Sequence, residues 1–270
     1  MGLNDGLQTF LRQDTNLCTV LRRETIERTR EALKVIEDAY ARFSDEEIAI
    51  SYNGGKDCLV LLVLLVAYLE DRAMSNGATK AAIKSVYVSI KDPFTEVDEF
   101  VISSAEQYNL EVVKIQKPMK EAFAEYLYDN PTIRAILVGT RRNDPHGAHL
   151  SFFDETDQGW PKFMRVHPII NWKYAEIWDF LRALKVPYCD LYDRGYTSLG
   201  GTGDTLPNPS LELGTIFEGA RDDSHTQYRP AWQLNDGTEE RRGRDRARAQ
   251  GRTMANSINK HNSIDVDHKR

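Results

Sequence analysis

The sequence predicts an α/β fold: a mostly parallel sheet flanked by helices, followed by a loop-rich C-terminal extension. Three observations predict it. Short apolar runs alternate with longer helix-like stretches from residue 46 to residue 186. Several of the short runs are apolar almost throughout, which indicates strands buried on both faces. The strand-like and helix-like segments also follow one another singly, as in consecutive βαβ units.

The composition is that of an acidic globular protein. The chain has 270 residues, with 35 Lys and Arg against 41 Asp and Glu, a formal charge of −6. Its 41% hydrophobic content is enough for a sizeable core and excludes global disorder. Because no stripe of interleaved basic and aromatic residues is present, we expect no nucleic-acid partner.

Other protein classes are excluded by what the chain lacks. The longest apolar run, Cys58 to Leu69, is shorter than the roughly 20 residues that cross a bilayer, so we expect no membrane partner. The N-terminus has no secretory signal, so we expect a cytoplasmic protein. The three cysteines form no CxxC pair, which argues against disulfides and against a cysteine zinc site.

The first elements surround a Gly-Gly turn. From Asn16 to Phe43, apolar residues recur at helical spacing among charges, which predicts an amphipathic helix packed outside the core. We assign residues 1–45 to an N-terminal helical extension. Glu46 to Asn53 is a short apolar run that predicts a strand entering the turn, and Cys58 to Met74 is long enough for a buried helix.

The strand–helix pattern then repeats. The predicted elements are a strand at Ile83 to Ile90, a helix at Phe94 to Asn109, a strand at Leu110 to Gln116, a helix at Met119 to Asn130 and a strand at Ile133 to Thr140. We assign residues 46–186 to the α/β domain. Ligands of such sheets bind beyond the carboxyl ends of the strands, where the loops 53–57 and 139–144 would meet if their strands are neighbours.

The amino-acid composition changes after Asp144, where Gly, Pro, Asn and Asp become frequent. One strand-like piece, Phe163 to Asn171, and one helix, Lys173 to Val186, remain recognisable. Residues 187–245 carry too much Gly and Pro for an independent core, and we assign them to a loop-rich substrate-binding subdomain. We expect the polar tail 246–270 to be disordered.

The sharpest feature is the segment SYNGGKD, residues 51–57, which lies between the first strand and the buried helix. Gly54 and Gly55 allow a tight turn that brings N–H groups against phosphate oxygens, while Lys56 and the helix dipole add positive potential. The spacing matches neither the Walker loop nor the GxGxxG fingerprint. A plain strand-to-helix turn is the alternative, but the polar residues around the glycines favour a pyrophosphate site.

These residues resemble a known family. SYNGGKD is similar to the modified pyrophosphatase loop of the adenine-nucleotide α-hydrolase-like fold, which includes PAPS reductases and FMN adenylyltransferases. The segments that follow resemble the eukaryotic FAD synthetases in sequence order; they are GTRRNDP, GWPKFMRVHPIINW, IWDFLRALKVPYCDLYDRGYTSLG and YRPAW. The resemblance covers about Ser51 to Arg244. Because only about 50 residues precede the loop, the chain resembles the short, single-domain form of fungi.

The resemblance implies a nucleotidyltransferase that converts ATP and FMN into FAD and pyrophosphate, with Mg²⁺ accompanying ATP. We expect a monomer whose partners are the small molecules ATP and FMN. The residues expected to bind ATP are Ser51, Tyr52, Asn53, Gly54, Gly55 and Lys56. Asp57 would hold Mg²⁺ directly or through water; a carboxylate that only stabilises the helix N-terminus is the alternative.

Further site residues follow from the same resemblance. Asp144 is expected to position metal or substrate and Arg142 to bind the FMN phosphate, unless RRNDP is a solvated Asp-Pro turn. The residues expected to bind FMN are Arg142, Asp144, Tyr192, Arg194, Tyr196 and Ser198, and the expected catalytic residues are Asn53, Asp57, Asp144, Arg241 and Arg244. The alternatives are an aromatic packing loop at 192–200 and a solvated charged tail at 239–244.

Rival functions stay open. A PAPS reductase-like enzyme needs a nucleophilic cysteine near the C-terminus, and none follows Cys189. Another ATP pyrophosphatase, such as a sulfurtransferase or amidotransferase, should show catalytic cysteines or an ammonia-supplying domain. A non-catalytic nucleotide-binding module would tolerate loss of GTRRNDP and YDRGYTSLG, which are both present. Trp172 and Trp178 are interpreted as core anchors, and His146, His149 and His167 as loop histidines because they lack zinc-ligand spacing.

Overall fold

The computed structural model of the chain describes residues 3–76, 81–217 and 224–249. The chain divides into two compact units, Met1–Cys189 and Asp190–Arg270. Residues 242–249 are helical, so the prediction of a disordered tail is wrong for residues 246–249, and the rest of the predicted tail lies outside the described residues. In the described part of the chain, no helix combines the length and apolar character needed to cross a membrane.

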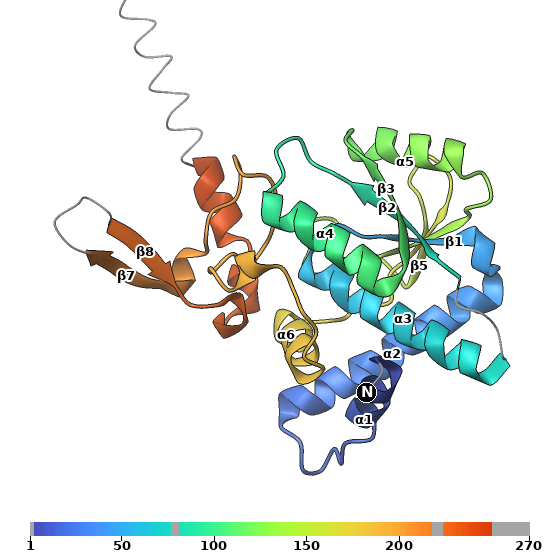
Figure 1. Ribbon diagram of the computed structural model, residues 1–270, viewed down its shortest axis with the longest axis horizontal. Coiled ribbons are helices and arrows are strands. Elements are labelled where there is room, and N and C mark those ends of the chain that lie inside the picture. Colours follow the sequence, from blue (N-terminus) through green and yellow to red (C-terminus); the bar gives the residue numbers. More distant parts are fainter. Residues whose placement is uncertain (1–2, 77–80, 218–223, 250–270) are drawn as a thin grey trace, which may run out of the picture. The chain divides into compact units, whose positions relative to one another are not determined.

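The first unit contains a six-stranded sheet and six helices (Figure 1). The strands are β1 (Ile48–Ser51), β2 (Ile83–Val88), β3 (Leu110–Ile115), β4 (Ala135–Val138), β5 (Phe153–Glu155) and β6 (Met164–Val166). The helices are α1 (Leu3–Leu11), α2 (Val20–Arg42), α3 (Lys56–Asn76), α4 (Thr95–Tyr108), α5 (Met119–Asp129) and α6 (Tyr174–Ala183).

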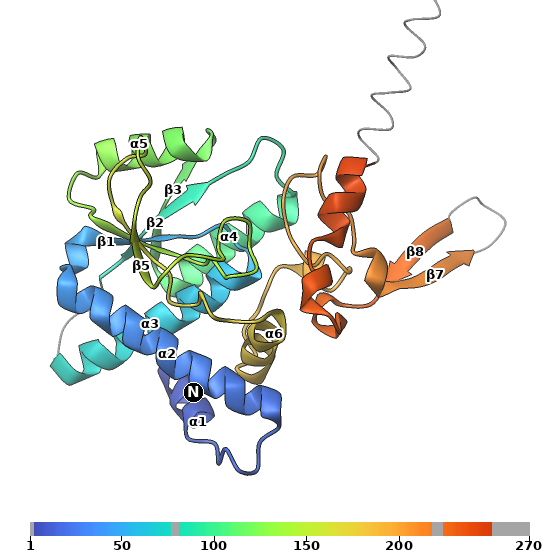
Figure 2. The same ribbon diagram turned by 180° about the vertical axis from the view of Figure 1, so that it is seen from behind.

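The strand order is β3-β2-β1-β4-β6-β5, with every neighbouring pair parallel except β5 with β6. The prediction of a mostly parallel sheet flanked by helices is therefore confirmed. The chain moves from β1 outward to β3 and then returns across β1 to β4. Since such crossovers are right-handed, α3 and α4 cover one face of the sheet and α5 the other (Figures 1 and 2).

Each face of the sheet has its own packing. Helix α3 is apolar on almost all sides, and residues 59–67 are at most 1% exposed because the helix lies between the sheet and α1, α2 and α6. On the other face, Phe123 and Tyr126 of α5 pack with Ala49, Val86 and Ile136 of the strands. Both layers shield the sheet from water and leave the strand ends as the place for a site.

The N-terminal helices differ from the prediction. Helix α1 lies within the predicted N-terminal helical extension but was not predicted as a separate helix, and the expectation that α2 packs outside the core is wrong. Ile26 and Ile36 of α2 are fully buried, and the helix packs against α3 and α6. Arg22 holds this arrangement through two 2.8 Å hydrogen bonds to Asp179 of α6. Trp172 and Trp178 are 2% and 3% exposed, which confirms both as core residues.

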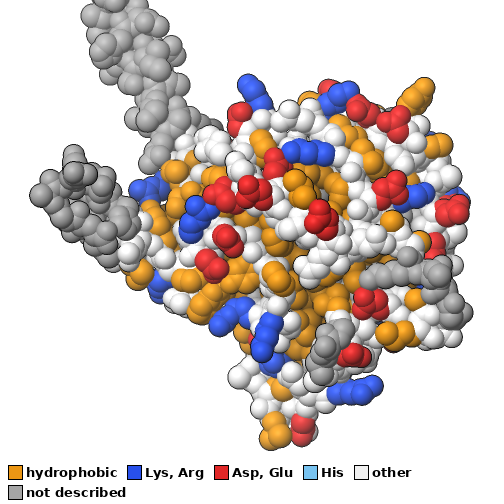
Figure 3. Space-filling model, in the orientation of Figure 1, with side chains coloured by type: hydrophobic (Ala, Val, Ile, Leu, Met, Phe, Trp, Pro, Cys, Tyr) orange, Lys and Arg blue, Asp and Glu red, His pale blue; other side chains and the backbone are white. Residues whose placement is uncertain are grey.

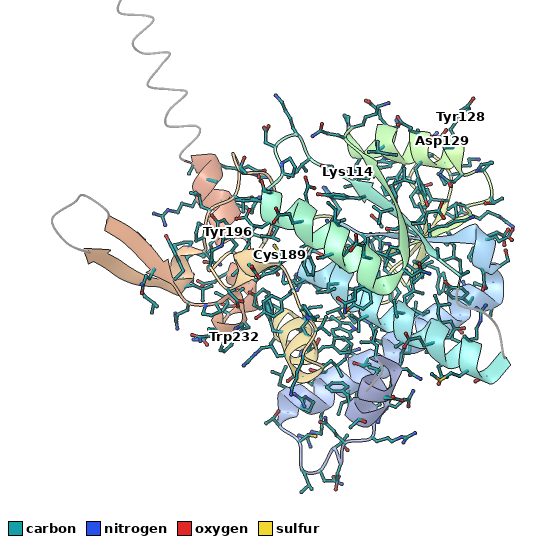
Figure 4. The ribbon with its side chains drawn as sticks, viewed as in Figure 1. Lys114, Tyr128, Asp129, Cys189, Tyr196 and Trp232 are labelled. Atoms are coloured by element: carbon teal, nitrogen blue, oxygen red, sulfur yellow. The ribbon has the colours of Figure 1, made fainter. Side chains whose placement is uncertain are left out.

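The second unit is built from short 3₁₀ turns, a hairpin and the helix 242–249. The hairpin, β7 (Glu212–Phe217) with β8 (Ser224–Tyr228), lies in a region predicted as loops. A buried amide organises the turns: Asn208 Nδ2 donates to Thr197 Oγ1 at 2.9 Å and to the Glu239 carbonyl at 2.8 Å. Tyr196 and Trp232 also belong to this unit (Figure 4).

Candidate active site

The central strands bring two polar loops together. Ser51 at the end of β1 pairs with Val138 at the end of β4, so the loops that follow these strands begin side by side. The sequence-based site required the strands before the loops 53–57 and 139–144 to be neighbours, and the structure confirms that they are. The contact is close at Gly139, where a Cβ would lie 2.9 Å from the backbone nitrogen of Cys58. Only glycine therefore fits at that position.

The phosphate loop has a defined internal structure. Gly54 has φ +73°, a left-handed conformation, and a Cβ there would lie 2.9 Å from a methyl group of Val101. Asn53 Oδ1 accepts a 3.0 Å hydrogen bond from the Gly55 N–H, which closes the turn ahead of α3. The Tyr52 ring points into the core, where its hydroxyl lies 2.9 Å from Ser104 Oγ. The exposed Asn53 and the half-buried Ser51 remain accessible beside the glycines.

Four charged side chains link the two loops in alternating order. Lys56 Nζ lies 3.1 Å from Asp57 Oδ2, and the other carboxylate oxygen of Asp57 lies 2.9 Å from Arg141 Nε. Arg141 Nη2 is 3.7 Å from Asp144 Oδ1, and the Arg141 backbone N–H donates to Asp144 Oδ2 at 2.8 Å. We refer to Lys56, Asp57, Arg141 and Asp144 as the charge chain. It joins the N-terminus of α3 to the loop after β4.

The two cations of the charge chain are buried, and its two positive charges balance its two negative charges. Lys56 is 2% exposed and Arg141 is fully buried. Burial by itself would raise the pKa of Asp57, but Arg141 and Lys56 together hold that pKa below its ordinary value, so the carboxylate stays ionised. An incoming polyphosphate would compete with Asp57 for these two cations. The arrangement can therefore transfer positive charge to a bound anion without a large movement of the backbone.

The two neighbouring arginines have different positions. Arg142, the predicted phosphate ligand, is exposed and fastens its own loop: Nε donates to Asn171 Oδ1 at 2.8 Å and Nη1 to the Leu150 carbonyl at 3.0 Å. Arg141 was not selected from the sequence, yet it is the arginine inside the charge chain. No sequence signal separates Arg141 from Arg142, because only the packing of the loop after β4 decides which of the two is buried.

A pocket of about 480 Å³ opens beside the charge chain. Its apolar wall comes from β2, α5 and the β5–β6 region, and it includes Val88, Met119, Phe123, Trp160 and Phe163. Ser51, Asn53 and Asp144 lie on its polar side. A planar heterocycle would fit between these walls, with a phosphate tail at the loop. Sequence reasoning did not find this pocket, because its residues come from separate segments.

His167 lines the same pocket although it is only 1% exposed. Neither of its ring nitrogens makes a hydrogen bond of good geometry, although the Val138 backbone lies close to the ring. Burial lowers the pKa of His167 to about 4 despite the opposing effect of that backbone, so its imidazole is neutral at physiological pH. The sequence placed this residue in a loop without a role, and the structure places it directly after β6.

The site fits a metal that arrives with a nucleotide. Within the described residues, no group of three or more His, Cys, Asp or Glu side chains could hold a metal ion by itself. Asp57 and Asp144 can contribute carboxylate oxygens from the two loops. Mg²⁺ prefers six oxygens and keeps several waters, so phosphate oxygens would have to complete its coordination.

The remaining predicted residues belong to the second unit. Arg244 donates to the Asp204 carboxylate at 2.7 Å and to the Leu199 carbonyl at 3.2 Å, so its guanidinium fastens the loop 199–204. Arg241 is half-buried and directly precedes the helix 242–249. Arg194 is exposed, Tyr196 and Ser198 are half-buried, and Tyr192 is 1% exposed. Their roles in binding FMN or in catalysis stay predictions.

Charged side chains of both signs are interspersed on the face of the molecule seen in Figure 3. This distribution agrees with the overall acidic balance of 35 basic against 41 acidic residues. The cations that would attract anionic substrates must therefore be gathered locally. Lys56 and Arg141 of the charge chain are such a local pair.

Comparison with known proteins identifies the family. The phosphoadenosine phosphosulfate reductase domain matches residues 47–131 and 118–207. The probable FAD synthase of Schizosaccharomyces pombe is 46% identical over 79% of this chain and 77% of its own length. The probable FAD synthase of Caenorhabditis briggsae is 40% identical over 81% of this chain, but the match spans only 40% of that protein's length.

Solved structures agree with the sequence matches. The FMN adenylyltransferase of Candida glabrata in complex with FAD and inorganic pyrophosphate superimposes with a TM-score of 0.81 at 28% identity, over 90% of this chain and 94% of that one. The same protein in complex with FMN and the ATP analogue AMPCPP gives the same score and coverage. The chain therefore belongs to the FAD synthase family, within the larger family of PAPS reductase domains.

Proposed function

We propose that this chain is an FMN adenylyltransferase, which converts ATP and FMN into FAD and pyrophosphate. One observation carries the proposal: a buried, alternating chain of charges joins the phosphate loop to the loop after β4, beside a pocket of a size for a planar ring. The reaction brings together two anionic substrates, and each needs cations at its phosphates and space for its heterocycle. The FAD synthases among its relatives support the same reaction.

ATP binds with its phosphates at the loop 53–56. The N-terminus of α3 and the backbone N–H groups near Gly54 and Gly55 favour an anion there. Lys56 Nζ, which lies 3.1 Å from Asp57 Oδ2, turns from this carboxylate to the phosphates when ATP binds. The glycine at 139 keeps the second loop close enough to close over the same phosphates.

The chemical step is in-line attack by an FMN phosphate oxygen on the α-phosphorus of ATP, with pyrophosphate leaving. A phosphate monoester has a second pKa of about 6, so this nucleophile is already largely ionised and needs no general base. The protein must position two polyanions and stabilise the leaving charge. Arg141 holds Asp57 and Asp144 in place for this task, and Lys56 offsets charge on the pyrophosphate.

Mg²⁺ bound with ATP would supply additional charge neutralisation at the phosphates. Asp57 and Asp144 are the residues that would hold it, directly or through water. Asp144 is the more accessible of the two, because 27% of its side chain is exposed against 19% for Asp57. Both carboxylates would therefore hold the metal, and Asp144 is the easier of the two to reach.

The pocket beside the charge chain receives the isoalloxazine ring of FMN. The dimethylbenzene end of this ring is apolar and requires a hydrocarbon wall, which Met119, Phe123 and Phe163 provide. Trp160 offers an aromatic surface for stacking. Adenine is smaller and more polar and does not need such a wall. Roles for Tyr192, Arg194, Tyr196 and Ser198 in FMN binding, for Arg241 and Arg244 in catalysis, and a cytoplasmic monomeric state, remain predictions from the sequence.

An assay with purified protein, ATP, Mg²⁺ and FMN tests the function, with riboflavin as the control acceptor. We expect FAD and pyrophosphate in equal amounts from FMN and neither product from riboflavin. Pyrophosphate without FAD would point to another acceptor and contradict the proposal. Neither product from a folded protein that still binds ATP would favour a non-catalytic nucleotide-binding module.

The variant Trp160→Ala tests the ring pocket. We expect the KM for FMN to rise by about tenfold while the KM for ATP stays within about twofold, because one aromatic contact is worth roughly 1 kcal/mol or more. Tyr128→Ala is the matched control: Tyr128 is 86% exposed near the C-terminal end of α5 and does not line the pocket (Figure 4). An unchanged KM for FMN in Trp160→Ala would show that the flavin ring does not bind in this pocket.

A further inference from the structure

We infer that His167 is a specificity-determining residue for the flavin: its neutral imidazole hydrogen-bonds the polar edge of the isoalloxazine ring. The inference rests on the proposed function and adds a recognition group to the pocket. No metal-ligand spacing or phosphate-loop pattern involves this residue, and the reaction as derived above does not use it.

The position of His167 is fixed by the sheet. Val166, the last residue of β6, lies opposite Leu137 of β4, so His167 follows at the carboxyl end of the sheet. Its backbone N–H donates to the Phe152 carbonyl at 2.9 Å, and its carbonyl accepts from the Ile170 N–H at 3.2 Å. The backbone is thus fully bonded. The imidazole makes no hydrogen bond of good geometry, although the Val138 backbone lies close enough to oppose the lowering of its pKa by burial, and His167 lines the pocket.

An imidazole without good hydrogen bonds at this depth destabilises the fold. Burial removes water from both ring nitrogens, and the Val138 backbone replaces those hydrogen bonds only in part. A leucine of similar volume would satisfy the site better in the absence of a ligand. A ligand that enters the pocket and hydrogen-bonds the ring nitrogens removes the free-energy cost of leaving them unsatisfied, and this gain contributes to its binding.

Burial, and not the surrounding charges, favours the neutral ring. Asp154 on β5 opposes the effect of Arg165 on β6, and burial dominates both, which keeps the pKa of His167 near 4. Cys58, Asp144, His146 and Asp157 are the other titratable groups of the pocket besides Arg165. A neutral imidazole presents one donor and one acceptor. The pyrimidine end of a flavin has carbonyl groups beside an N–H, so it can satisfy both.

Arg165 supports this polar end of the pocket. It lies two residues before His167 and lines the same pocket. Its Nη2 donates to the Glu155 carbonyl at 2.8 Å, which fixes the guanidinium, and its Nε is buried with no hydrogen-bond partner. The pocket therefore has a hydrocarbon wall and a polar end formed by Arg165 and His167. A flavin ring has the same two-ended character.

The test compares His167→Leu with His167→Asn. Asn retains a donor and an acceptor, whereas Leu has neither. For each variant, quenching of flavin fluorescence gives the Kd for FMN, calorimetry gives the Kd for ATP, and thermal unfolding gives Tm. For His167→Leu we expect the Kd for FMN to rise about tenfold, the Kd for ATP to stay within about twofold and Tm to be unchanged or higher. His167→Asn should recover most of the FMN affinity.

His149→Leu is the matched control, because His149 is an exposed histidine that does not line the pocket. It should leave all three quantities unchanged. A lower Tm with unaltered FMN affinity in His167→Leu would make the residue structural and overturn the inference. A weakened Kd for ATP instead would place adenine in the pocket and overturn it as well.

Failure of the inference and failure of the proposed function are distinguishable. Wild-type protein that forms FAD, together with a His167→Leu variant that binds FMN normally, would sink the inference and leave the function intact. Wild-type protein that forms no FAD would contradict the function itself, whatever the variants show.

Discussion

Replacing Arg141 by leucine should damage both the stability and the activity of the protein. The guanidinium is fully buried and lies 2.9 Å from a carboxylate oxygen of Asp57. Its removal leaves that carboxylate in a desolvated position with Lys56, 3.1 Å away, as its nearest remaining cation. The Asp144 contact to the backbone N–H of residue 141 survives, so the loop keeps its turn.

The size of the effect follows from burial. Removing one partner of a buried ion pair costs about 3–5 kcal/mol, because the other charge is left uncompensated. Lys56 retains part of the compensation, so we expect the free energy of unfolding to fall by about 3 kcal/mol. With a urea m-value of about 2 kcal/mol per molar, the midpoint of unfolding should fall by about 1.5 M.

The effect should depend on pH in a defined direction. In the wild type the pKa of Asp57 is held below its ordinary value, so the ionised carboxylate stabilises the fold above about pH 4. Without Arg141, burial raises this pKa, and ionisation then opposes folding as pH rises. The deficit of the variant should therefore be larger at pH 8 than at pH 5.

Urea unfolding followed by tryptophan fluorescence measures this, since Trp160, Trp172 and Trp178 all lie in the first unit. Arg142→Leu is the control: the next arginine is exposed and bonds only its own loop and Asn171, so we expect a loss of about 1 kcal/mol. Equal losses for the two variants, or a deficit in Arg141→Leu that does not grow with pH, would refute the reasoning.

Three further predictions concern single positions. Asp144→Ala should lower kcat at least tenfold in the FAD-forming assay. Asp144→Asn retains an acceptor for the Arg141 N–H, so it should restore stability but not turnover. Wild-type turnover in Asp144→Ala would show that Asp144 takes no part in the reaction. The pKa of His167 is about 4 in the fold and about 6.5 in the unfolded chain, so the free energy of unfolding should fall by up to about 3 kcal/mol as pH decreases from 6.5 to 4. Urea unfolding at pH 7 and pH 4 should show a smaller decrease for His167→Asn than for the wild type. Gly139→Ala should weaken ATP binding in calorimetry, because the new Cβ would lie 2.9 Å from the Cys58 nitrogen, whereas Gly203→Ala, with no atom within 4 Å, should have no effect.

The sequence predicted the elements whose patterns are long and regular. The strand–helix alternation from β1 to β4 is visible because each element is long enough to show its period. Helix α1 and the edge strand β5 are short, and β5 is recognisable only through its antiparallel pairing with β6. The hairpin β7–β8 has a register shift between Glu212 and Gly214, which interrupts the alternation that would have marked a strand.

The candidate site was predictable in part. The two loops could be located because parallel strands end at one edge of the sheet, and the residue types at 51–57 indicated phosphate binding. The direction of a side chain could not be found in this way. Arg141 and Arg142 are chemically identical neighbours, and only the packing under β4 decides which is buried. The pocket and the orientation of His167 likewise depend on contacts between β2, α5 and β6 that no local pattern records.

The most direct test of the proposed chemistry follows the phosphorus atoms of ATP. Purified protein is incubated with FMN, Mg²⁺ and ATP labelled either at the α-phosphate or at the γ-phosphate, and the products are separated by chromatography. If the FMN phosphate attacks the α-phosphorus, the α-label appears in FAD and the γ-label in pyrophosphate. A γ-label in the flavin product, or an α-label released only as AMP, would contradict adenylyl transfer to FMN.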